Sequence, residues 1–216
     1  DEIVNASLDR DAYREKYGIP KDQFCVIVAD GAYASARSRS VVDELLKTDK
    51  NLTIIFLAGK NEFLYNTYKD LEDKTKPNIK LIVSGFTPIV HEMYCASDLF
   101  ITKAGPNAIL DSVFMRTPIL VDYYAHPIEK ATTKLFVDKF KCGVAIYKPK
   151  KIRKAVEDFI DNPEKLDLYK NNCTKFDRKQ NGAKDVAKFI IDEINKTNEK
   201  AWYKFQIWPW CNEIEP

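Results

Sequence analysis

The sequence predicts an α/β fold: a doubly wound parallel sheet of about six strands, followed by helices at the carboxyl-terminal end. Short apolar runs alternate with segments of helical hydrophobic spacing along most of the chain. The first of these runs is nearly continuous, which is typical of a strand that is covered on both faces. Strands separated by helices imply parallel pairing with right-handed crossovers.

The expected elements follow one another in a regular order. Strands are expected at residues 24–30, 52–58, 79–83, 99–102, 119–122 and 144–147. Helices are expected between them at residues 38–48, 62–73, 88–96, 106–116 and 128–140. From residue 151 the chain becomes helical and polar, with apolar stripes within 155–160 and 186–194. The sequence therefore divides into a linker and short helix at 1–20, a sheet domain at 21–200 and an aromatic tail at 201–216.

Composition and charge argue against several classes of protein. The 216 residues are 45% hydrophobic and 31% charged, as in ordinary globular domains. Thirty-four Lys and Arg against 32 Asp and Glu leave a formal charge of +2, which gives no electrostatic case for nucleic acid. No apolar run approaches the roughly 20 residues of a membrane-spanning helix, and no secretory signal opens the chain. The five scattered cysteines favour a reducing cytoplasm over a zinc site.

Ligands of open parallel sheets bind beyond the carboxyl ends of the strands, so the loops at those ends are the first candidates. The first such loop contains Gly31, Ala32 and Tyr33, where small residues let a backbone approach a phosphate or ribose. It lacks the glycine-rich dinucleotide fingerprint, and the second strand ends without the acid that would hold an adenosine ribose, which disfavours a dehydrogenase. A tight strand-to-helix turn explains this loop equally well.

Residues 103–111 carry the stronger signal. Gly105 lies at the bend and Pro106 takes a first-turn position, where proline sacrifices no helical hydrogen bond. The free N–H groups that begin at Asn107, together with the helix dipole, suit a diphosphate. Asp111 lies one to two turns into the helix, within reach of ribose hydroxyls. A capped helix with a solvated acid accounts for the same residues equally well.

The loop after the fifth strand groups His126, Glu129 and Lys130. Glu129 is suited to sugar hydroxyls and Lys130 to a phosphate. A single histidine on a loop is more often ordinary surface than a catalyst, and that interpretation is preferred for His126. The second histidine, His91, lies in a short amphipathic helix, where a structural role is expected.

The order of these features matches a known family of proteins. Residues 84–111, which read SGFTPIVHEMYCASDLFITKAGPNAILD, resemble the carboxyl-terminal domain of monogalactosyldiacylglycerol synthases. They are also similar to the processive diacylglycerol glucosyltransferases and, more distantly, to the peptidoglycan lipid-intermediate N-acetylglucosaminyltransferase. The resemblance covers about residues 10–195, and residues 84–130 are its specific part. It implies the GT-B architecture, in which the second of two Rossmann-like domains holds most of a nucleotide sugar.

The resemblance also implies roles for individual residues. The backbone near Phe86 and Thr87 would contact uracil, and the turn that begins at Gly105 would face the diphosphate. Asp111 takes the position of the ribose-binding acid, which is usually Glu in the family. Glu129 matches the second member of a Gln-Glu pair that holds the donor sugar.

The sequence departs from the family pattern at two places. The glycine-rich first loop of the family reads Ala-Asp-Gly-Ala at residues 29–32, so its diphosphate contacts are expected to be weaker or rearranged. Ile128 stands where the Gln of the pair is expected, and Thr132 stands where Asn is frequent. Since isoleucine cannot hydrogen-bond a sugar hydroxyl, either the donor differs from galactose and glucose or turnover is reduced.

The implied activity is transfer of a hexose from a UDP-sugar to a diacylglycerol-like lipid, with no cofactor and no metal. The acceptor site and the catalytic base are expected in an amino-terminal domain missing from this chain, so the isolated chain should bind UDP but transfer little. Peripheral association with the inner face of a membrane is expected, with the aromatic tail docked on the missing domain or placed at the membrane interface. Two alternatives stay open: a UDP-sugar epimerase of the same architecture, and a non-catalytic nucleotide-binding or regulatory module.

Overall fold

The computed structural model describes residues 2–177 and 182–196. Within these residues one sheet is formed by β1 (Phe24–Val28), β2 (Leu52–Gly59), β3 (Ile79–Gly85), β4 (Leu99–Lys103), β5 (Ile119–Tyr123) and β6 (Gly143–Ala145). The strands lie in the order β3-β2-β1-β4-β5-β6, and every neighbouring pair is parallel. The expected doubly wound parallel sheet of six strands is thereby confirmed.

Helices connect the strands at nearly the expected places. The described helices are α1 (Glu2–Asn5), α2 (Arg10–Lys16), α3 (Ala36–Leu45), α4 (Glu62–Lys69), α5 (Val90–Ala96), α6 (Pro106–Phe114), α7 (Pro127–Thr133), α8 (Pro149–Asp161), α9 (Glu164–Cys173) and α10 (Gly182–Lys196). Two expected helices are each divided. The 3-10 turn η1 (Glu72–Lys74) follows α4, and the π-helical segment η2 (Lys134–Lys139) continues α7 with wider turns.

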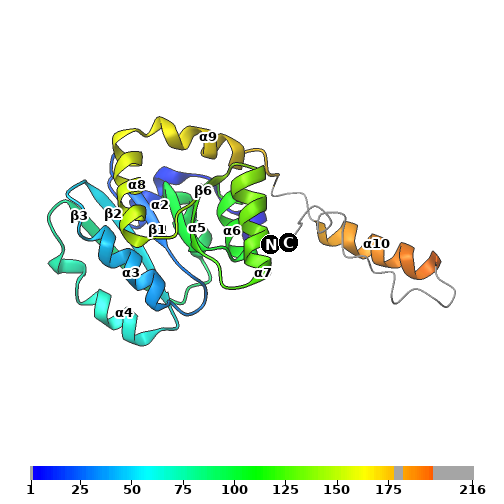
Figure 1. The fold of residues 1–216 in the computed structure, drawn as a ribbon, viewed down its shortest axis with the longest axis horizontal. Coiled ribbons are helices and arrows are strands. Elements are labelled where there is room, and N and C mark those ends of the chain that lie inside the picture. Colours follow the sequence, from blue (N-terminus) through cyan, green and yellow to red (C-terminus); the bar gives the residue numbers. More distant parts are fainter. Residues whose placement is uncertain (1, 178–181, 197–216) are drawn as a thin grey trace. The chain divides into compact units, whose positions relative to one another are not determined.

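The sheet is the middle layer of three, with helices on both faces (Figure 1). Helices α3, α4 and α8 contribute apolar side chains to the core on one face, while α5, α6 and η2 contribute to the core on the other. The central strand β1 shows why its sequence is apolar throughout: Val26 and Val28 face the first core, and Cys25 and Ile27 face the second. All four side chains are buried, as expected for a strand covered on both sides.

A buried arginine ties the amino-terminal segment to the sheet. Arg14, on α2, is only 2% exposed, and its guanidinium donates to Asp98 Oδ2 at 2.9 Å and to the backbone carbonyls of Pro20, Lys21, Gln23 and Ala96. Asp98 directly precedes β4, so this contact lies at the amino-terminal edge of the sheet. A buried ion pair is tolerated when its charges are paired and its remaining hydrogen-bonding groups have partners, and Arg14 meets both conditions.

Two further cations complete the amino-edge cluster, the group formed by Arg10, Arg14, Asp98 and Lys170. Arg10 and Lys170 approach Asp98 Oδ1 at 2.6 and 3.4 Å. The backbone N–H of Cys25 donates to Asp98 Oδ2 at 3.0 Å. Burial favours the neutral acid, yet the neighbouring cations and this N–H group hold the pKa of Asp98 below its ordinary value.

The chain divides into two compact units, Asp1–Phe176 and Asp177–Pro216. Within the second unit, α10 exposes the apolar stripe that the sequence predicted, including Phe189, Ile191 and Ile194. The proposed boundaries of the linker, sheet domain and tail stay predictions. The aromatic tail at 201–216 lies outside the described residues. Among the residues that the structure describes, no helix is long and apolar enough to cross a bilayer.

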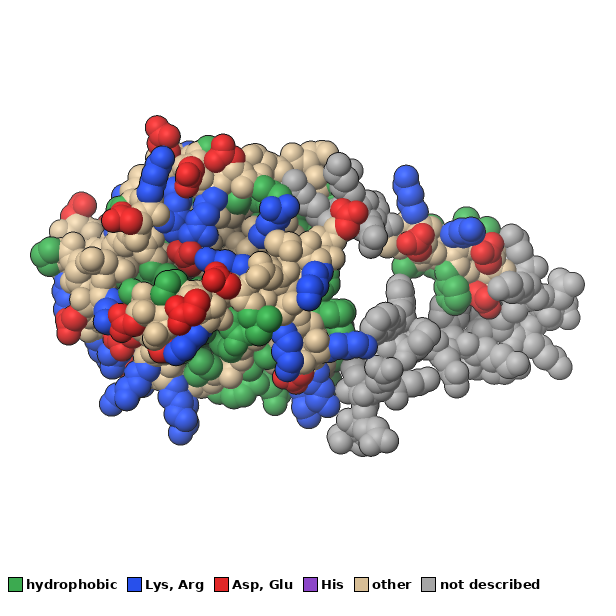
Figure 2. Space-filling model, turned by 90° about the horizontal axis from the view of Figure 1, so that it is seen from above, with side chains coloured by type: hydrophobic (Ala, Val, Ile, Leu, Met, Phe, Trp, Pro, Cys, Tyr) green, Lys and Arg blue, Asp and Glu red, His purple; other side chains and the backbone are tan. Residues whose placement is uncertain are grey.

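Acidic and basic side chains are mixed on the side of the first unit that α8 and α9 cover. Figure 2 views this side and shows Lys and Arg interspersed with Asp and Glu. Several of these charges form exposed pairs, such as Lys50 with Asp161 and Lys165 with Asp158. Four of the cysteines, Cys25, Cys95, Cys142 and Cys173, are buried in the described part of the chain.

Candidate functional site

The sheet changes winding direction between β1 and β4. From β1 the strand order runs through β2 to β3, and from β4 it runs through β5 to β6. The carboxyl-terminal ends of the two central strands are adjacent. Val28 pairs with Ile101, and the N–H of Ala29 donates to the carbonyl of Ile101. In open α/β sheets, the loops that leave such a switch point diverge, and ligands bind in the crevice between them. The loops after β1 and β4 are both candidates from the sequence.

The loop after β4 leads directly into the amino terminus of α6. Gly105 is the N-cap, with φ of −66° and ψ of 119°, and Pro106 is the first helical residue. The N–H groups of Asn107 and Ala108 therefore have no partner within the helix. A Cβ added to Gly105 would meet nothing within 4 Å. Neither backbone conformation nor packing requires glycine here, so its effect is to keep the space before the helix open.

The loop after β1 is fixed against the end of β2. The N–H of Lys60 donates to the carbonyl of Ala32 at 2.7 Å, and Tyr33 forms an isolated bridge with Gly59. Gly59 has φ of 60°, and a Cβ there would lie 2.3 Å from the carbonyl oxygen of Ala32. Only glycine permits this approach. Gly31 also has positive φ, at 108°, so the loop keeps a bare backbone near the crevice.

A salt bridge between Arg37 and Asp122 lies where β5 ends. Arg37, in the first turn of α3, donates to Asp122 Oδ2 at 3.0 Å and to the carbonyls of Asp122 and Tyr147. Asp122 Oδ1 is buried and has no hydrogen-bond partner among the described residues. Burial raises the pKa of Asp122 to about 6, and the negative charge of Asp30 adds to the effect, although Arg37 opposes it. Ser35 caps α3 and hydrogen-bonds to Asp30.

Glu129 is held at the start of α7 by two kinds of contact. Its Oε2 accepts hydrogen bonds from the backbone N–H groups of Ala125 and His126, at 2.7 and 3.2 Å. Its Oε1 lies 3.3 Å from the ammonium of Lys103. Glu129 is 7% exposed, and burial alone would favour the neutral acid. The Ala125 N–H group and Lys103 outweigh it and keep the pKa of Glu129 below its ordinary value.

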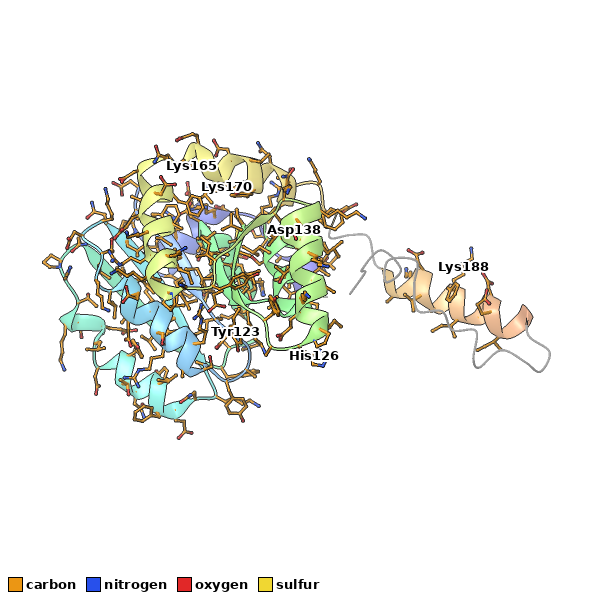
Figure 3. All side chains as sticks on the ribbon, viewed as in Figure 1. Tyr123, His126, Asp138, Lys165, Lys170 and Lys188 are labelled. Atoms are coloured by element: carbon orange, nitrogen blue, oxygen red, sulfur yellow. The ribbon has the colours of Figure 1, made fainter. Side chains whose placement is uncertain are left out.

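The other predicted residues of this loop lie around the same helix start. His126 is the N-cap of α7, and its Nδ1 accepts from the N–H of Ile128 at 3.4 Å. Figure 3 labels His126 together with Tyr123, the last residue of β5, at the same end of the sheet. Lys130 is exposed, and Ile128 is 57% exposed. His126 thus caps α7, and the roles in donor binding given to His126 and Lys130 stay predictions.

Phe86 and the first loop share a neighbour. The side chain of Phe86 is 64% exposed, and the ammonium of Lys60 lies 5.1 Å from its ring centre. The backbone of Lys60 binds Ala32, so one residue bridges the ends of β1, β2 and β3. Thr87 accepts a hydrogen bond from the N–H of Ile89 at 3.3 Å. The backbone near Phe86 thus lies at the same edge of the sheet as the crevice.

Asp111, in the second turn of α6, is half buried. Burial raises its pKa, and His91 on α5 partly opposes this shift. The negative charge of Asp111 in turn contributes to a raised pKa of Tyr94, also on α5, after the larger effect of burial. Asp111 is therefore not a fully solvated acid, and His91 is close enough to influence it electrostatically.

Three residues whose side chains were given no role from the sequence belong to this edge. Lys103 bonds to Glu129, while Arg37 and Asp122 join the start of α3 to the end of β5. Two of them have a recognisable position in the sequence. Lys103 directly precedes the Ala-Gly-Pro turn, and Asp122 is an acid within an otherwise apolar strand. No short-range pattern links Arg37 with Asp122, because 85 positions separate them along the chain.

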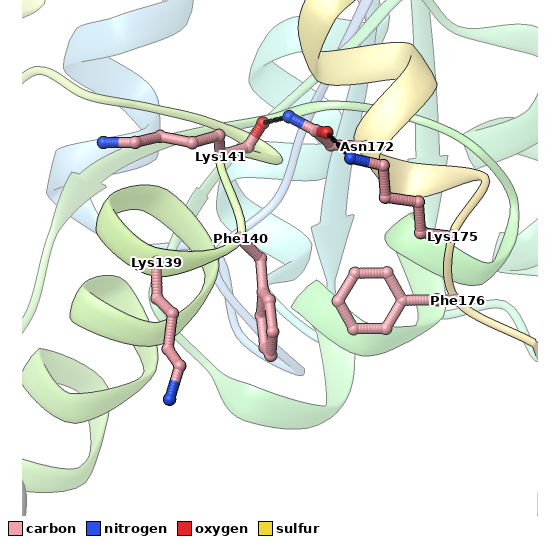
Figure 4. A pocket seen from close by; sticks show the side chains of 6 residues that line it. All are labelled: Lys139, Phe140, Lys141, Asn172, Lys175 and Phe176. Atoms are coloured by element: carbon pink, nitrogen blue, oxygen red, sulfur yellow. Dashed lines mark hydrogen bonds between the residues drawn. The ribbon is translucent and has the colours of Figure 1, made fainter.

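A pocket of about 430 Å³ lies elsewhere. Figure 4 shows its lining residues, Lys139, Phe140, Lys141, Asn172, Lys175 and Phe176. They flank the start of β6. In a parallel sheet the strands all start at one edge, and the loops after β1 and β4 leave from the other edge. This pocket is therefore separate from the crevice. Over residues 2–177 and 182–196, no group of three or more His, Cys, Asp or Glu side chains could hold a metal ion.

The fold and the crevice define a doubly wound domain with an open helix amino terminus at its switch point. The profile of the Glycosyltransferase family 28 C-terminal domain matches residues 34–190, and the chain belongs to this family. It is 21% identical over 198 residues to a processive diacylglycerol beta-glucosyltransferase of Bacillus pumilus, covering 91% of this chain and 51% of that protein. The chain thus spans about half the length of this relative.

Two other comparisons agree with the assignment. The chain is 31% identical over 138 residues to monogalactosyldiacylglycerol synthase 3 of Arabidopsis thaliana, covering 63% of this chain and 28% of that protein. A solved structure of Anabaena HepE in complex with UDP-glucose has a TM-score of 0.64 and 12% identity, covering 89% of this chain and 54% of that one. At this identity the structural likeness establishes the fold alone, which is the Rossmann-like domain that the sequence resemblance implied as one half of the GT-B architecture.

Proposed function

We propose that this chain is the donor-binding domain of a glycosyltransferase that transfers a hexose from a UDP-sugar to a diacylglycerol-type lipid. The observation that supports it most is the open amino terminus of α6 at the switch point, with Gly105 as its cap, in a chain of this family. Relatives named for transfer to diacylglycerol support the acceptor class, and a neighbour solved with UDP-glucose supports the donor class.

The parts of the donor are assigned along the crevice. The diphosphate occupies the space before α6, where the N–H groups of Asn107 and Ala108 and the helix dipole favour negative charge. Asp111 accepts hydrogen bonds from the ribose, and the backbone near Phe86 contacts uracil. When the bond to the sugar breaks, negative charge builds up on UDP. The same N–H groups stabilise this charge without having to move.

The resemblance implies a sugar subsite that departs from the family pattern. Glu129 is the remaining member of the sugar-binding pair, and one of its oxygens already caps α7. Ile128 offers no hydrogen bond and is exposed beside it. We propose that the donor sugar is held by fewer polar groups than in the relatives, so discrimination between hexoses is weak and the diphosphate supplies most of the affinity.

The acceptor side lies outside this domain. We propose that a second domain supplies the lipid site and the catalytic base, since the chain spans about half of its relatives' length. The isolated chain then binds UDP but transfers little sugar.

Action at a membrane surface follows from a lipid acceptor, so the assembled enzyme would be a peripheral membrane protein. No metal or cofactor takes part in this proposal. The relatives' names favour transfer over an epimerase or a regulatory module.

Calorimetric titration with UDP tests the donor site. Asp111→Ala should weaken UDP binding by about 1–3 kcal/mol, because a carboxylate hydrogen-bonded to ribose is lost. Asp138→Ala, which removes an exposed acid from η2, is the matched control and should leave the affinity unchanged. Asp138, which Figure 3 labels, lies on η2, whereas Asp111 lies on α6. Absence of UDP binding at millimolar nucleotide would contradict the proposed function.

A further inference from the structure

Lys103 connects the first loop, the helix α6 and Glu129. It is the last residue of β4, and its carbonyl accepts a hydrogen bond from the N–H of Gly105 at 2.7 Å, so its backbone forms the turn before α6. Its side chain runs past Gly31, where an added Cβ would lie 3.7 Å from Lys103 Cε. The ammonium then reaches Glu129 Oε1 at 3.3 Å. Lys103 is 33% exposed, so it can turn without leaving the site.

The two oxygens of Glu129 are bound differently. Oε2 receives two backbone hydrogen bonds that fix the carboxylate on the first turn of α7. Oε1 faces Lys103 at a distance longer than the roughly 2.7–2.9 Å of a strong charge-assisted hydrogen bond. The Lys103 side chain is 33% exposed, whereas the Glu129 side chain is only 10% exposed. If Lys103 leaves, the two backbone hydrogen bonds to Oε2 still favour the charged carboxylate and hold it in place.

We propose that Lys103 exchanges partners when a nucleoside diphosphate binds, leaving Glu129 Oε1 for the diphosphate and so freeing that oxygen for a hydroxyl of the sugar. This inference rests on the proposed function and adds the order of events within the site. A diphosphate at the amino terminus of α6 carries more negative charge than a single carboxylate and attracts the ammonium more strongly. No covalent bond forms or breaks in this step.

The exchange makes recognition of the sugar stronger when a diphosphate is bound. Without a diphosphate, Lys103 occupies one acceptor position of Oε1, so fewer positions are left for a hydroxyl of a free hexose. With a diphosphate, Oε1 is already aimed because Oε2 stays bound to the α7 backbone. A group held in place before the ligand arrives costs no ordering entropy on binding.

Titration of Lys103 variants tests the first half of the exchange. Lys103→Met should weaken UDP binding about tenfold while leaving uridine binding unchanged, because uridine carries no phosphate. Lys103→Arg should retain most of the affinity, since it keeps the charge. Lys165→Met removes a lysine that pairs with Asp158 between α8 and α9, and this control should not change UDP binding. In Figure 3, Lys165 is labelled at the top of the first unit, and Tyr123 and His126 are labelled toward its lower part.

A double-mutant cycle tests the second half. Glu129→Gln keeps an oxygen for the α7 cap but removes the charge that competes for Lys103. UDP should therefore bind about threefold more tightly to this variant, and the gain should largely disappear in the Lys103→Met background. Equal gains in both backgrounds would mean that the carboxylate merely repels the ligand, and the exchange would be rejected.

The failures of the two proposals are distinguishable. If the wild-type chain does not bind UDP, the proposed function fails. If the wild type binds UDP and Lys103→Met binds it equally well, only the exchange fails. Circular dichroism and thermal unfolding check that each variant is folded. Should Lys103→Met not fold, Lys103→Gln removes the same charge with a polar side chain, and the same criteria apply to it.

Discussion

The two edges of the sheet each hold a buried aspartate against an arginine, and the two contacts differ in how completely they are satisfied. At the amino edge, Asp98 receives hydrogen bonds from Arg14 and the Cys25 N–H group, and two further cations approach it. At the carboxyl edge, Asp122 binds Arg37 through one oxygen and leaves Oδ1 without a partner among the described residues.

The pKa shifts of the two acids have opposite signs for this reason. The pKa of Asp98 is lowered because its partners outweigh the effect of burial, whereas the pKa of Asp122 is raised to about 6 because burial outweighs Arg37. The amino edge is built as a closed structural contact. The carboxyl edge retains unsatisfied and exchangeable groups, including the Lys103–Glu129 pair, and such groups are typical of binding sites.

Removing the acid of the closed edge should give the largest change in stability. Asp98→Ala leaves the buried guanidinium of Arg14 without its carboxylate, so the free energy of unfolding should fall by about 3–5 kcal/mol. Urea denaturation followed by circular dichroism measures it. UDP affinity of the folded fraction should not change. A loss below about 1 kcal/mol would show that the amino edge is no more tightly built than the other.

The two aspartates should also give stability opposite dependences on pH. The folded protein binds a proton at Asp122 more tightly than the unfolded chain does, whose ordinary pKa is about 3.9. Stability should therefore fall by about 2 kcal/mol as the pH rises from about 4 to 7 through this group. Asp98 acts in the other direction: its contribution is present at neutral pH and is lost as the pH falls through its lowered pKa.

Urea midpoints measured from pH 4 to 7 for the wild type and Asp122→Asn isolate the Asp122 effect. The variant cannot titrate at this position, so the fall in stability over this range should be smaller by the Asp122 contribution. If the urea midpoints of the two proteins changed in parallel with pH, the pKa of Asp122 would not be raised in the folded protein.

Gly105 tests whether the open edge is a binding site and not merely a loosely packed one. Its φ of −66° suits any residue, and a Cβ would meet nothing, so Gly105→Val should change stability by less than about 1 kcal/mol. The added side chain occupies the space before α6, and UDP affinity should fall at least about tenfold. Unchanged affinity in calorimetry would place the diphosphate elsewhere.

The smallest effect is expected from the outermost cation of the closed edge. Lys170 is partly exposed and lies 3.4 Å from Asp98 Oδ1, where Arg10 is nearer. Lys170→Met should therefore cost about 0.2–1 kcal/mol of stability in urea denaturation. A cost close to that of Asp98→Ala would mean that the cations act as one cooperative unit.

The sequence predicted the sheet well because its signals are local. The run that begins at Phe24 and the Gly105-Pro106 turn place β1 and α6 within a few residues of where they lie. Helix ends were less predictable. The expected helix at 128–140 is divided because its second half takes the wider π-helical turns, and residue spacing alone does not distinguish the two.

The candidate site was predictable only where its residues carry a sequence motif. Gly105, Asp111 and Glu129 stand at recognisable distances from strand ends, and the binding roles given to them stay predictions. The sequence did not reveal that Glu129 caps α7 with one oxygen and pairs with Lys103 through the other. That contact depends on how two separate loops meet, which is decided by tertiary packing.

The absence of a side chain at Gly59 has a consequence for engineering the domain. Because the carbonyl of Ala32 occupies the place of a Cβ on Gly59, the loops after β1 and β2 form one interlocked piece. A glycine-rich loop grafted from a relative into residues 31–34 would have to reproduce this approach or be exchanged together with residues 59–61. Redesign of this part of the candidate site therefore requires transplanting both segments as a single module.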